Sequence, residues 1–589
     1  MIRRRLPLLA AAACSVAALP VFAPSLGDLR PGSILAHIAA AGQVTPAMDR
    51  IPSDAAVTIA IKDMGKLKSG IESMAKALGV PAEAMGGMLQ VDAVFNMQGL
   101  DAAGSAAIGI MSVDGDEPDA IAIVPVRDYA AFVKGLGGTG SGVEELKLEE
   151  NPVFVKNIEG GFAAFSPKKE LVEKFAGKPG NAKAHEAMMG AAGKSIAESR
   201  DVVIVANMSR MGDKVKEGLQ GFKDGMGMAM MMAGGGGDLG FLDTFVDTFV
   251  RDASAGIIGA NIAEDGLTLD FAAQFKEGTE YAGYFNAKGK ASQLLAALPN
   301  QQILFAMAMD TSGPGMKTLM KNMEKFGQIM QPQADGGGPG MFPADWAKNS
   351  DGMAFQIGNS PAPMGGLFLN TVAYIKSSNP EAFQKGMKDS LKAVSGKTIQ
   401  GITYTTTYQE NVKAGERTAD AWSMKMAADP EDPQAQMLNQ VNFMLFGPNG
   451  LNGYAMKADG GLIMTYAKNA DLLGQAVTAS KGGDNMTADA DIKAIAAKLP
   501  PGRTMEGYIG VKSLMDTVLG ALGAMGMAPN IEIPENIPPI GMGATTDGGG
   551  IRMTVVIPTK VMTSIKAMAE AMDMGGGGDD EDNAGQLKF

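Results

Sequence analysis

The chain has 589 residues, and its 51 Lys and Arg against 64 Asp and Glu give a formal net charge of −13 at pH 7. This acidic balance argues against a nucleic-acid surface and against electrostatic docking on anionic lipid. The single cysteine, Cys14, excludes a disulfide within the chain and a metal centre built from several cysteines.

Residues 1–23 have the features of a secretory signal peptide. Three arginines at 3–5 form a basic segment, residues 6–19 are apolar, and Val21-Phe22-Ala23 offers a small-residue cleavage site. We therefore expect export to the periplasm or the cell exterior, with no transmembrane span after cleavage. A lipoprotein signal ending at Cys14 and a twin-arginine signal are the alternatives. Residues 24–50, rich in Ala, Pro and Gly, are expected to form a linker or a short helix.

The second half of the chain repeats the first half in the same order. Four phrases recur, at 51–78 and 299–327, 154–175 and 454–477, 199–219 and 501–519, and 257–275 and 540–557. A repeat of roughly 250 residues is longer than the repeats of solenoid proteins. The sequence therefore predicts two tandem, related halves at 51–295 and 296–558.

Each half is predicted to open with a strand and an amphipathic helix. Val57, Ile59 and Ile61 alternate with smaller residues, which is typical of a half-buried strand. Apolar residues then recur at helical spacing, at Met64, Leu67, Ile71, Met74 and Leu78. The second half has the corresponding stripe at Met316, Leu319, Met320, Met323 and Phe326.

Glycines mark tight hairpin turns in both halves. They follow acidic residues at 159–161 and 459–461, and again at 265–266 and 547–548. Glycine supplies the positive φ that such turns need. Hairpins next to helices predict an α+β fold in which each half is a largely antiparallel sheet with amphipathic helices packed on it.

The remaining segments are expected to be accessory. Gly-rich insertions at 225–240 and 331–343 are interpreted as flexible loops. Residues 559–574 are predicted to form a C-terminal helix, followed by a disordered acidic tail at 575–589.

One motif suggests catalysis. Ser166-Pro167-Lys168-Lys169 fits the SxxK pattern of serine acyl-enzymes, in which the lysine assists proton transfer at the serine. Its counterpart in the second half places Thr465 and Lys468 at the same spacing, and Ser73 with Lys76 also fits, within a predicted helix. The structural alternative makes Ser166 a helix N-cap, with Pro167 in the first turn.

Three segments resemble phosphate-binding loops without their context. Residues 135–140 satisfy GxGxxG, but a helix precedes them and a strand follows, the reverse of a dinucleotide site. Residues 193–195 (Gly-Lys-Ser) and 396–398 (Gly-Lys-Thr) lack the earlier glycine of a P-loop. We interpret all three as structural, and no cofactor is expected.

Metal ligands are sparse. His185 precedes Glu186 but lacks the second histidine of HExxH, and His37 has no neighbouring ligand. Acidic residues cluster in one turn, at Asp114, Asp116, Glu117 and Asp119, without the spacing of an EF-hand. Methionines cluster at 226, 228, 230, 231 and 232, where their thioethers could bind Cu(I) or simply fill an apolar core or groove.

The repeated plan of residues 51–558, a polar opening with Pro, a strand and an amphipathic helix, resembles uncharacterised exported bacterial proteins built from duplicated domains of unknown function. This resemblance implies an extracytoplasmic α+β protein and assigns no catalytic residue. We expect a non-enzymatic binding or structural protein whose partner is an apolar small molecule, held between the halves, or an envelope protein. An exported serine hydrolase using Ser166 and Lys169, and copper binding by the methionines of 225–233, are the alternatives.

Overall fold

The computed structural model describes residues 44–80, 98–113, 118–148, 151–218, 220, 240–321, 349–360, 366–399, 402–428, 435–524 and 533–574. The protein is α+β, with 36% helix and 36% strand, and its strands pair in antiparallel fashion. Two compact units are present. The first runs up to Asn286 and also contains Asp547–Thr554, whereas the second consists of Ala287–Thr546 and Val555–Asp579.

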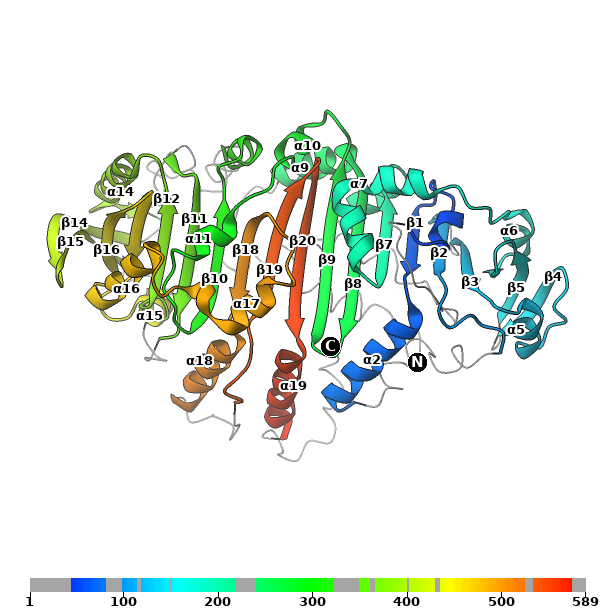
Figure 1. Ribbon diagram of the computed structural model, residues 1–589. Coiled ribbons are helices and arrows are strands. Elements are labelled where there is room, and N and C mark those ends of the chain that lie inside the picture. The colour runs from blue at the N-terminus through cyan, green and yellow to red at the C-terminus, as the bar shows by residue number, and fades with distance from the viewer. Residues whose placement is uncertain are drawn as a thin grey trace. The chain divides into compact units, whose positions relative to one another are not determined.

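The first unit is built on antiparallel strands joined mostly by hairpins or single helices (Figure 1). Its strands are β1 (Val57–Ile61), β2 (Ala106–Ser112), β3 (Asp119–Pro125), β4 (Val143–Leu148), β5 (Asn151–Ile158), β6 (Phe162–Ser166), β7 (Val202–Asn207), β8 (Ala253–Ala263) and β9 (Gly266–Phe275). Their pairings give the order β4-β5-β6-β3-β2-β1-β7-β8-β9. The first strand in the chain therefore lies inside the sheet, with later strands on both sides.

Helices pack on this sheet and bury its apolar side chains. They are η2 (Met48–Arg50), α2 (Met64–Leu78), α5 (Tyr129–Gly135), α6 (Lys169–Lys174), α7 (Ala182–Ser199), α9 (Gly240–Asp252) and α10 (Glu280–Tyr284), and residues 208–218 are also helical. α7 packs across β7, β8 and β9, and α2 packs on β8. Phe132 and Phe165, both almost fully buried, meet edge to face at 5.9 Å within one of the cores.

The second unit contains the strands from β10 onward. They are β10 (Ile303–Asp310), β11 (Gly352–Gly358), β12 (Thr371–Lys376), β13 (Thr398–Ile399), β14 (Ile402–Ala414), β15 (Arg417–Ala428), β16 (Leu451–Ala458), β17 (Gly461–Thr465), β18 (Arg503–Ile509) and β19 (Ile540–Asp547), with the end of β20 (Gly550–Pro558). Their pairings give the order β13-β14-β15-β16-β17-β12-β11-β10-β18-β19.

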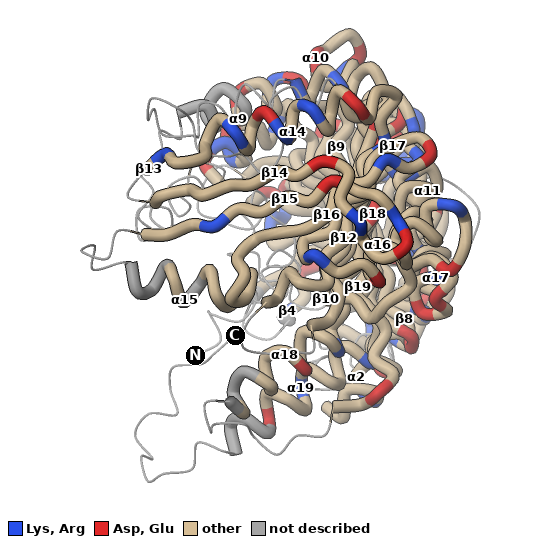
Figure 2. The backbone as a smooth tube through the Cα atoms, turned by 90° about the vertical axis from the view of Figure 1, so that its left-hand side faces the viewer, with Lys and Arg blue, Asp and Glu red and all other residues tan. Residues whose placement is uncertain are grey.

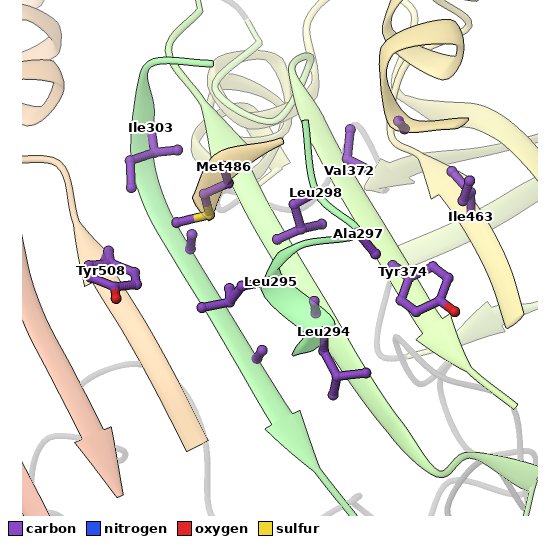
Figure 3. Packing of buried hydrophobic residues seen from close by; sticks show 14 of the residues in the cluster. Leu294, Leu295, Ala297, Leu298, Ile303, Val372, Tyr374, Ile463, Met486 and Tyr508 are labelled. Carbon is purple, nitrogen blue, oxygen red and sulfur yellow. The ribbon is translucent and has the colours of Figure 1, made fainter. Parts of the chain in front are cut away.

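The helices of the second unit are α11 (Ala291–Leu295), α14 (Pro380–Val394), α15 (Ala435–Phe446), α16 (Ala470–Ser480), η3 (Met486–Ala488), α17 (Ala490–Ala496), α18 (Val511–Ala524) and α19 (Thr559–Met574), and residues 314–321 are helical. α14 and α15 pack on the β14–β15 hairpin (Figure 2). The largest core gathers around α11 and β10 (Figure 3), where Leu295 and Tyr508 are fully buried. Each such side chain stabilises the fold by about 1.5–3 kcal/mol.

Several predicted elements are confirmed. The strand at 57–61, the helix at 64–78 and the C-terminal helix at 559–574 have the predicted positions. The glycine turn at 159–161 joins β5 to β6, with φ of 84° at Gly160 and 77° at Gly161. The turn at 459–461 joins β16 to β17, with a positive φ of 73° at Gly460, whereas Gly461 already belongs to β17. An α+β fold with antiparallel sheet is therefore confirmed.

Other predictions need correction. Ser166 is not a helix N-cap, because it ends β6, and α6 begins only at Lys169. Of the segment expected to be a linker or a short helix, residues 48–50 form the short helix η2, and the segment is packed rather than free, since Ala47 is fully buried and Met48 is 1% exposed. The two compact units divide β20, since Asp547–Thr554 belong to the first unit, and the predicted halves at 51–295 and 296–558 stay a prediction.

The predicted helical stripe near residue 316 is described only to residue 321, so Met323 and Phe326 lie outside the described residues. The insertion at 331–343, nearly all of the insertion at 225–240, and the predicted signal peptide and acidic tail also lie outside them.

Candidate functional sites

The Ser166–Lys169 pair does not form a nucleophile and base. Ser166 is 2% exposed, and its Oγ donates a hydrogen bond to the Ala120 carbonyl oxygen at 2.8 Å. The same Oγ accepts a hydrogen bond from the backbone N–H of Lys168. Lys169 lies on α6, where its Nζ is 3.5 Å from Glu173 Oε1. A catalytic serine needs a base within hydrogen-bond reach, and this hydroxyl is instead bonded to backbone groups.

The counterpart in the second half has a similar structural role. Thr465 ends β17, is fully buried, and donates from Oγ1 to the Ala467 carbonyl oxygen at 2.8 Å. Its Oγ1 also accepts a hydrogen bond from the Tyr454 N–H at 3.0 Å. In both halves the hydroxyl therefore ties a strand end to nearby backbone. The third match, Ser73, lies within α2.

The GxGxxG segment is a loop between α5 and β4, as interpreted from the sequence. Its backbone N–H groups point at a carboxylate of the chain itself. The N–H of Thr139 donates to Glu144 Oε2 at 2.5 Å, and the N–H of Ser141 donates to Oε1 at 2.6 Å. Slight burial opposes ionisation of Glu144, but these hydrogen bonds outweigh it and lower the pKa of this carboxyl below its usual value. An internal anion therefore occupies the place where a phosphate would bind.

The other two phosphate-loop segments also have structural positions. Gly193, Lys194 and Ser195 lie within α7, and Ser195 Oγ accepts a hydrogen bond from Arg552 at 2.6 Å. Gly396 has a φ of 77° in the turn before β13. Neither segment connects a strand to the start of a helix, as a P-loop does.

His185 is a buried structural histidine. It is fully buried at the start of α7, and its Nε2 lies 2.9 Å from the Ile51 carbonyl oxygen. The carbonyl can only accept, so Nε2 carries the proton, and Nδ1 has no hydrogen-bond partner among the described residues. Burial lowers the pKa of His185 below its usual value, against smaller opposing effects of the Ile51 hydrogen bond and of Asp49.

No group of three or more His, Cys, Asp or Glu side chains converges within the described residues. Of the predicted acidic turn, Asp119 is described, and its Oδ1 pairs with Lys168 Nζ at 2.6 Å. Asp114, Asp116 and Glu117 lie outside the described part of the chain, as do His37 and the methionines at 226–232.

A buried charged cluster in the first unit, which the sequence analysis missed, is here named the Asp270 centre: Asp270, Arg200, Arg552, Thr554 and Ser195. The Asp270 side chain is fully buried. Its Oδ1 accepts from Arg552 Nε at 2.7 Å and from Thr554 Oγ1, while its Oδ2 accepts from Arg200 Nε. Each carboxylate oxygen therefore receives a guanidinium donor, which offsets part of the desolvation cost of the charge.

The second unit has a comparable cluster, the Glu506 centre: Glu506, Arg503, Tyr508 and Ser292. Glu506 Oε2 accepts from Arg503 Nε at 2.7 Å and from Ser292 Oγ at 2.5 Å. Its Oε1 accepts from the Tyr508 hydroxyl at 2.6 Å. Burial, and then the Glu506 charge, raise the pKa of Tyr508 well above its usual value. In both centres each carboxylate oxygen accepts at least one hydrogen bond from a side chain of the same unit, so the evident role of both is to hold strands and helices together.

One signal in the sequence could have indicated these centres. Asp270 and Arg552 each stand in an apolar strand phrase, in the segments 257–275 and 540–557 that resemble each other in sequence. A charge at an inward strand position has to find a buried partner. Opposite charges in matching phrases therefore suggest a pair, although the pattern alone does not say which residues meet.

We find no family model that matches the chain, no match among curated proteins and no match among solved structures. The resemblance to duplicated exported proteins therefore stays a prediction. Among the described helices, none combines the length and the apolar character needed to cross a membrane.

Proposed function

We propose that this chain is an exported, non-enzymatic binding protein built from two related halves, and that it carries an apolar ligand. Duplication is supported by the strand order of the two units. In the first unit, the order from β5 to β8 is β5-β6-β3-β2-β1-β7-β8. In the second, the strands at the same places in the chain follow the order β16-β17-β12-β11-β10-β18-β19.

A binding role is supported by the hydrogen bonds of those side chains that could otherwise act in catalysis. The Ser166 and Thr465 hydroxyls bond to backbone, and Glu144 fills the glycine-rich loop. His185 donates to a backbone carbonyl within the core. A duplicated catalytic site would also be expected to keep its nucleophile in both halves, whereas Ser166 is replaced by Thr465.

The observation that carries the proposal is the pair α18–α19 in the second unit. On their inner side Val511, Met515 and Val561 form a small core with Ile537. Other apolar side chains of the two helices are exposed: Leu514 is 49% exposed, Ile565 is 48% exposed, and Val518 on α18 is 37% exposed. Large apolar side chains that stay exposed beside the buried residues of a helix pair favour a binding site for an apolar molecule.

Methionine suits such a surface, because its unbranched thioether side chain adapts to irregular partners. Met515 is buried in the small core, and Met568 on α19 is partly buried against it. The expectation that a ligand lies between the two halves stays a prediction, since the α18–α19 pair belongs to the second unit alone.

Native mass spectrometry and lipid extraction of the full chain, purified from its own host, test the proposal. We expect an apolar molecule to co-purify, and Leu514→Gln together with Ile565→Gln to reduce its occupancy at least about tenfold, the effect of losing about 1.4 kcal/mol of binding energy. Phe443→Gln is the matched control, because Phe443 lies on α15 with 48% exposure. Absence of any apolar molecule, or equal loss in the control, would contradict the proposal.

A further inference from the structure

We propose that the second unit docks on the surface of a neutral phospholipid bilayer through an apolar patch at the end of α15. Two short segments form the patch, the turn at 366–369 and the last turn of α15. This contact goes beyond the proposed function and does not depend on it, because the ligand is assigned to α18 and α19. The surface is here named the α15 patch, and its members are large apolar side chains: Leu367, Phe368, Leu369, Phe443, Met444, Leu445 and Phe446.

Backbone hydrogen bonds hold the two segments of the α15 patch together. The Met444 carbonyl oxygen accepts from the Leu367 N–H at 3.1 Å, and the Leu445 carbonyl oxygen accepts from the Phe368 N–H at 2.9 Å. The rings of Phe368 and Phe446 stack at a centroid distance of 5.6 Å. These bonds satisfy carbonyl groups that the end of a helix leaves without partners. The patch is therefore a fixed part of the folded unit.

None of the seven side chains of the α15 patch is buried. Phe443 is 48% exposed and Met444 is 51% exposed, and the other five are half-buried. Large apolar side chains are usually placed in a core, and a contiguous apolar patch that stays exposed marks a contact surface.

The sequence around the patch contains no charge. Residues 352–375 and 434–456, which include both segments, have no Lys, Arg, Asp or Glu, although 20% of the whole chain is charged. Figure 2 accordingly shows α15 without a blue or red segment. A charged side chain is costly to move into lipid, whereas the polar rim of a protein–protein interface accommodates charges. Two charge-free stretches that meet at one exposed apolar patch therefore favour lipid over a protein partner.

One lysine beside the patch suits the headgroup layer. A Cβ on Gly450, in the loop after α15, would lie 3.5 Å from Lys425 Cγ, so the lysine stem passes close to this loop. A lysine can lay its stem along apolar surface and keep its ammonium at the polar boundary. Because the chain has a net charge of −13, we expect a neutral rather than an anionic bilayer.

The exposed apolar side chains of α18 and α19 have different neighbours. Lys512 pairs with Asp516 on α18 at 2.9 Å, and Lys566 pairs with Glu570 on α19 at 3.2 Å. Contact of these helices with lipid would dehydrate four charges, which is costly. We therefore assign the bilayer contact to the α15 patch, and the two charged helices provide the comparison.

Flotation of the full chain with vesicles of phosphatidylcholine tests the docking. We expect the wild type to float with the vesicles. Phe443→Gln together with Met444→Gln should lower its partition coefficient at least about tenfold, because binding scales with the apolar area buried in the bilayer. Leu514→Gln together with Ile565→Gln is the matched control, since it removes two side chains of similar exposure and should leave flotation unchanged. Vesicles of anionic phosphatidylglycerol should bind the chain no better.

The docking and the proposed function can fail separately. Co-purification of an apolar molecule depends on Leu514 and Ile565 and should not respond to Phe443→Gln, whereas flotation should respond in the opposite way. A chain that floats without carrying an apolar molecule would support the docking and contradict the carrier. A chain that carries the molecule but does not float would do the reverse.

Fluorescence quenching provides a second readout that a folding defect does not imitate. In a chain with Trp346→Phe, phosphatidylcholine brominated on its acyl chains should quench Phe443→Trp and should not quench Leu514→Trp. Absence of flotation in the wild type, or equal quenching at the two positions, would overturn the proposal. So would a wild type that binds no vesicles and forms dimers that Phe443→Gln with Met444→Gln abolishes, because the patch would then join two copies of the chain.

Discussion

Arg552 donates a hydrogen bond to Asp270 across 2.7 Å, although 282 positions separate the two residues in the chain. Both side chains are nearly or fully buried, at 6% and 0% exposure. The pair therefore fixes a segment near the C-terminal end of the chain to a strand that lies much earlier in the sequence. The pair matters for stability because it is buried: a charge that is removed from water and then loses its partner strongly destabilises the folded state.

Asp270→Asn should destabilise the first unit by about 3–5 kcal/mol, because it leaves two guanidinium groups around a neutral amide. Urea unfolding followed by circular dichroism measures this loss. Glu173→Gln is the control, since Glu173 forms an exposed pair with Lys169 and should change stability by less than about 0.5 kcal/mol. Equal effects of the two substitutions would count against a dominant role of the Asp270 centre.

Gly190→Ala should destabilise the protein by at least about 2 kcal/mol. Gly190 kinks α7 with φ 58° and ψ −159°, a conformation that favours glycine. A Cβ there would lie 2.0 Å from Oε1 of the buried Gln274. Gly283→Ala in α10 is the control, because no neighbour lies within 4 Å of its added Cβ and alanine favours the helix. Thermal unfolding of both variants measures the contrast, and a neutral Gly190→Ala would contradict the assigned strain.

Local patterns predicted local structure well. The alternation from Val57 to Ile61 specifies a strand, and the glycines at 160 and 161 specify a turn. Both depend on residues that are neighbours in the chain, so a short stretch of sequence is enough to predict each. Ser166 shows the limit of this reasoning. Its neighbours resemble a helix start, but its hydroxyl bonds to Ala120 on another strand, and no nearby residue indicates that contact.

The candidate sites were harder to predict for the same reason. Arg552 belongs to the first unit and bonds to Asp270 there, a relationship that depends on how distant strands pair. Nothing in the sequence around His185 indicates that its imidazole bonds to the Ile51 carbonyl oxygen. A motif such as SxxK specifies spacing along the chain, whereas catalysis depends on side-chain geometry in space.

Ser166→Ala should cost about 1–3 kcal/mol, because it leaves the Ala120 carbonyl without its hydroxyl donor. A fluorophosphonate probe should label neither the wild type nor the variant at this position, since the hydroxyl is 2% exposed and bonded to backbone. Intact-mass measurement after probe treatment is the readout. Labelling of the wild type that disappears in Ser166→Ala would establish the hydrolase alternative.

His185 should make stability fall in mild acid. Burial lowers its pKa in the folded state, so between the ordinary value of 6.5 and the folded value the unfolded chain binds the proton first. The free energy of unfolding then decreases as pH falls below 6.5, by up to about 1.4 kcal/mol per pH unit. His185→Gln keeps a donor but does not titrate. Urea unfolding at pH 7.5 and 5.5 should show the advantage of wild type over this variant shrinking in acid; a constant difference would contradict the assignment.

Tyr466 should make stability fall in alkali. Burial raises its pKa from 10.0 to about 12. Between these values the unfolded chain releases the proton first, so the free energy of unfolding decreases by about 1.4 kcal/mol for each pH unit. Tyr466→Phe keeps the ring that meets Phe355 at 5.9 Å and Trp422 at 5.7 Å. The variant should therefore gain stability relative to wild type as pH rises from 9 to 11.

The fluorescence of Trp422 measures this gain, because Trp422 is 3% exposed in the second unit and Trp346→Phe removes the other tryptophan. The remaining tyrosines titrate equally in both proteins, so the difference between the two unfolding curves isolates Tyr466. At pH 7 the phenol is neutral in both states, and the curves there give the cost of losing the hydroxyl itself. A difference that stays the same from pH 9 to 11 would show that the Tyr466 hydroxyl reaches solvent in the folded protein.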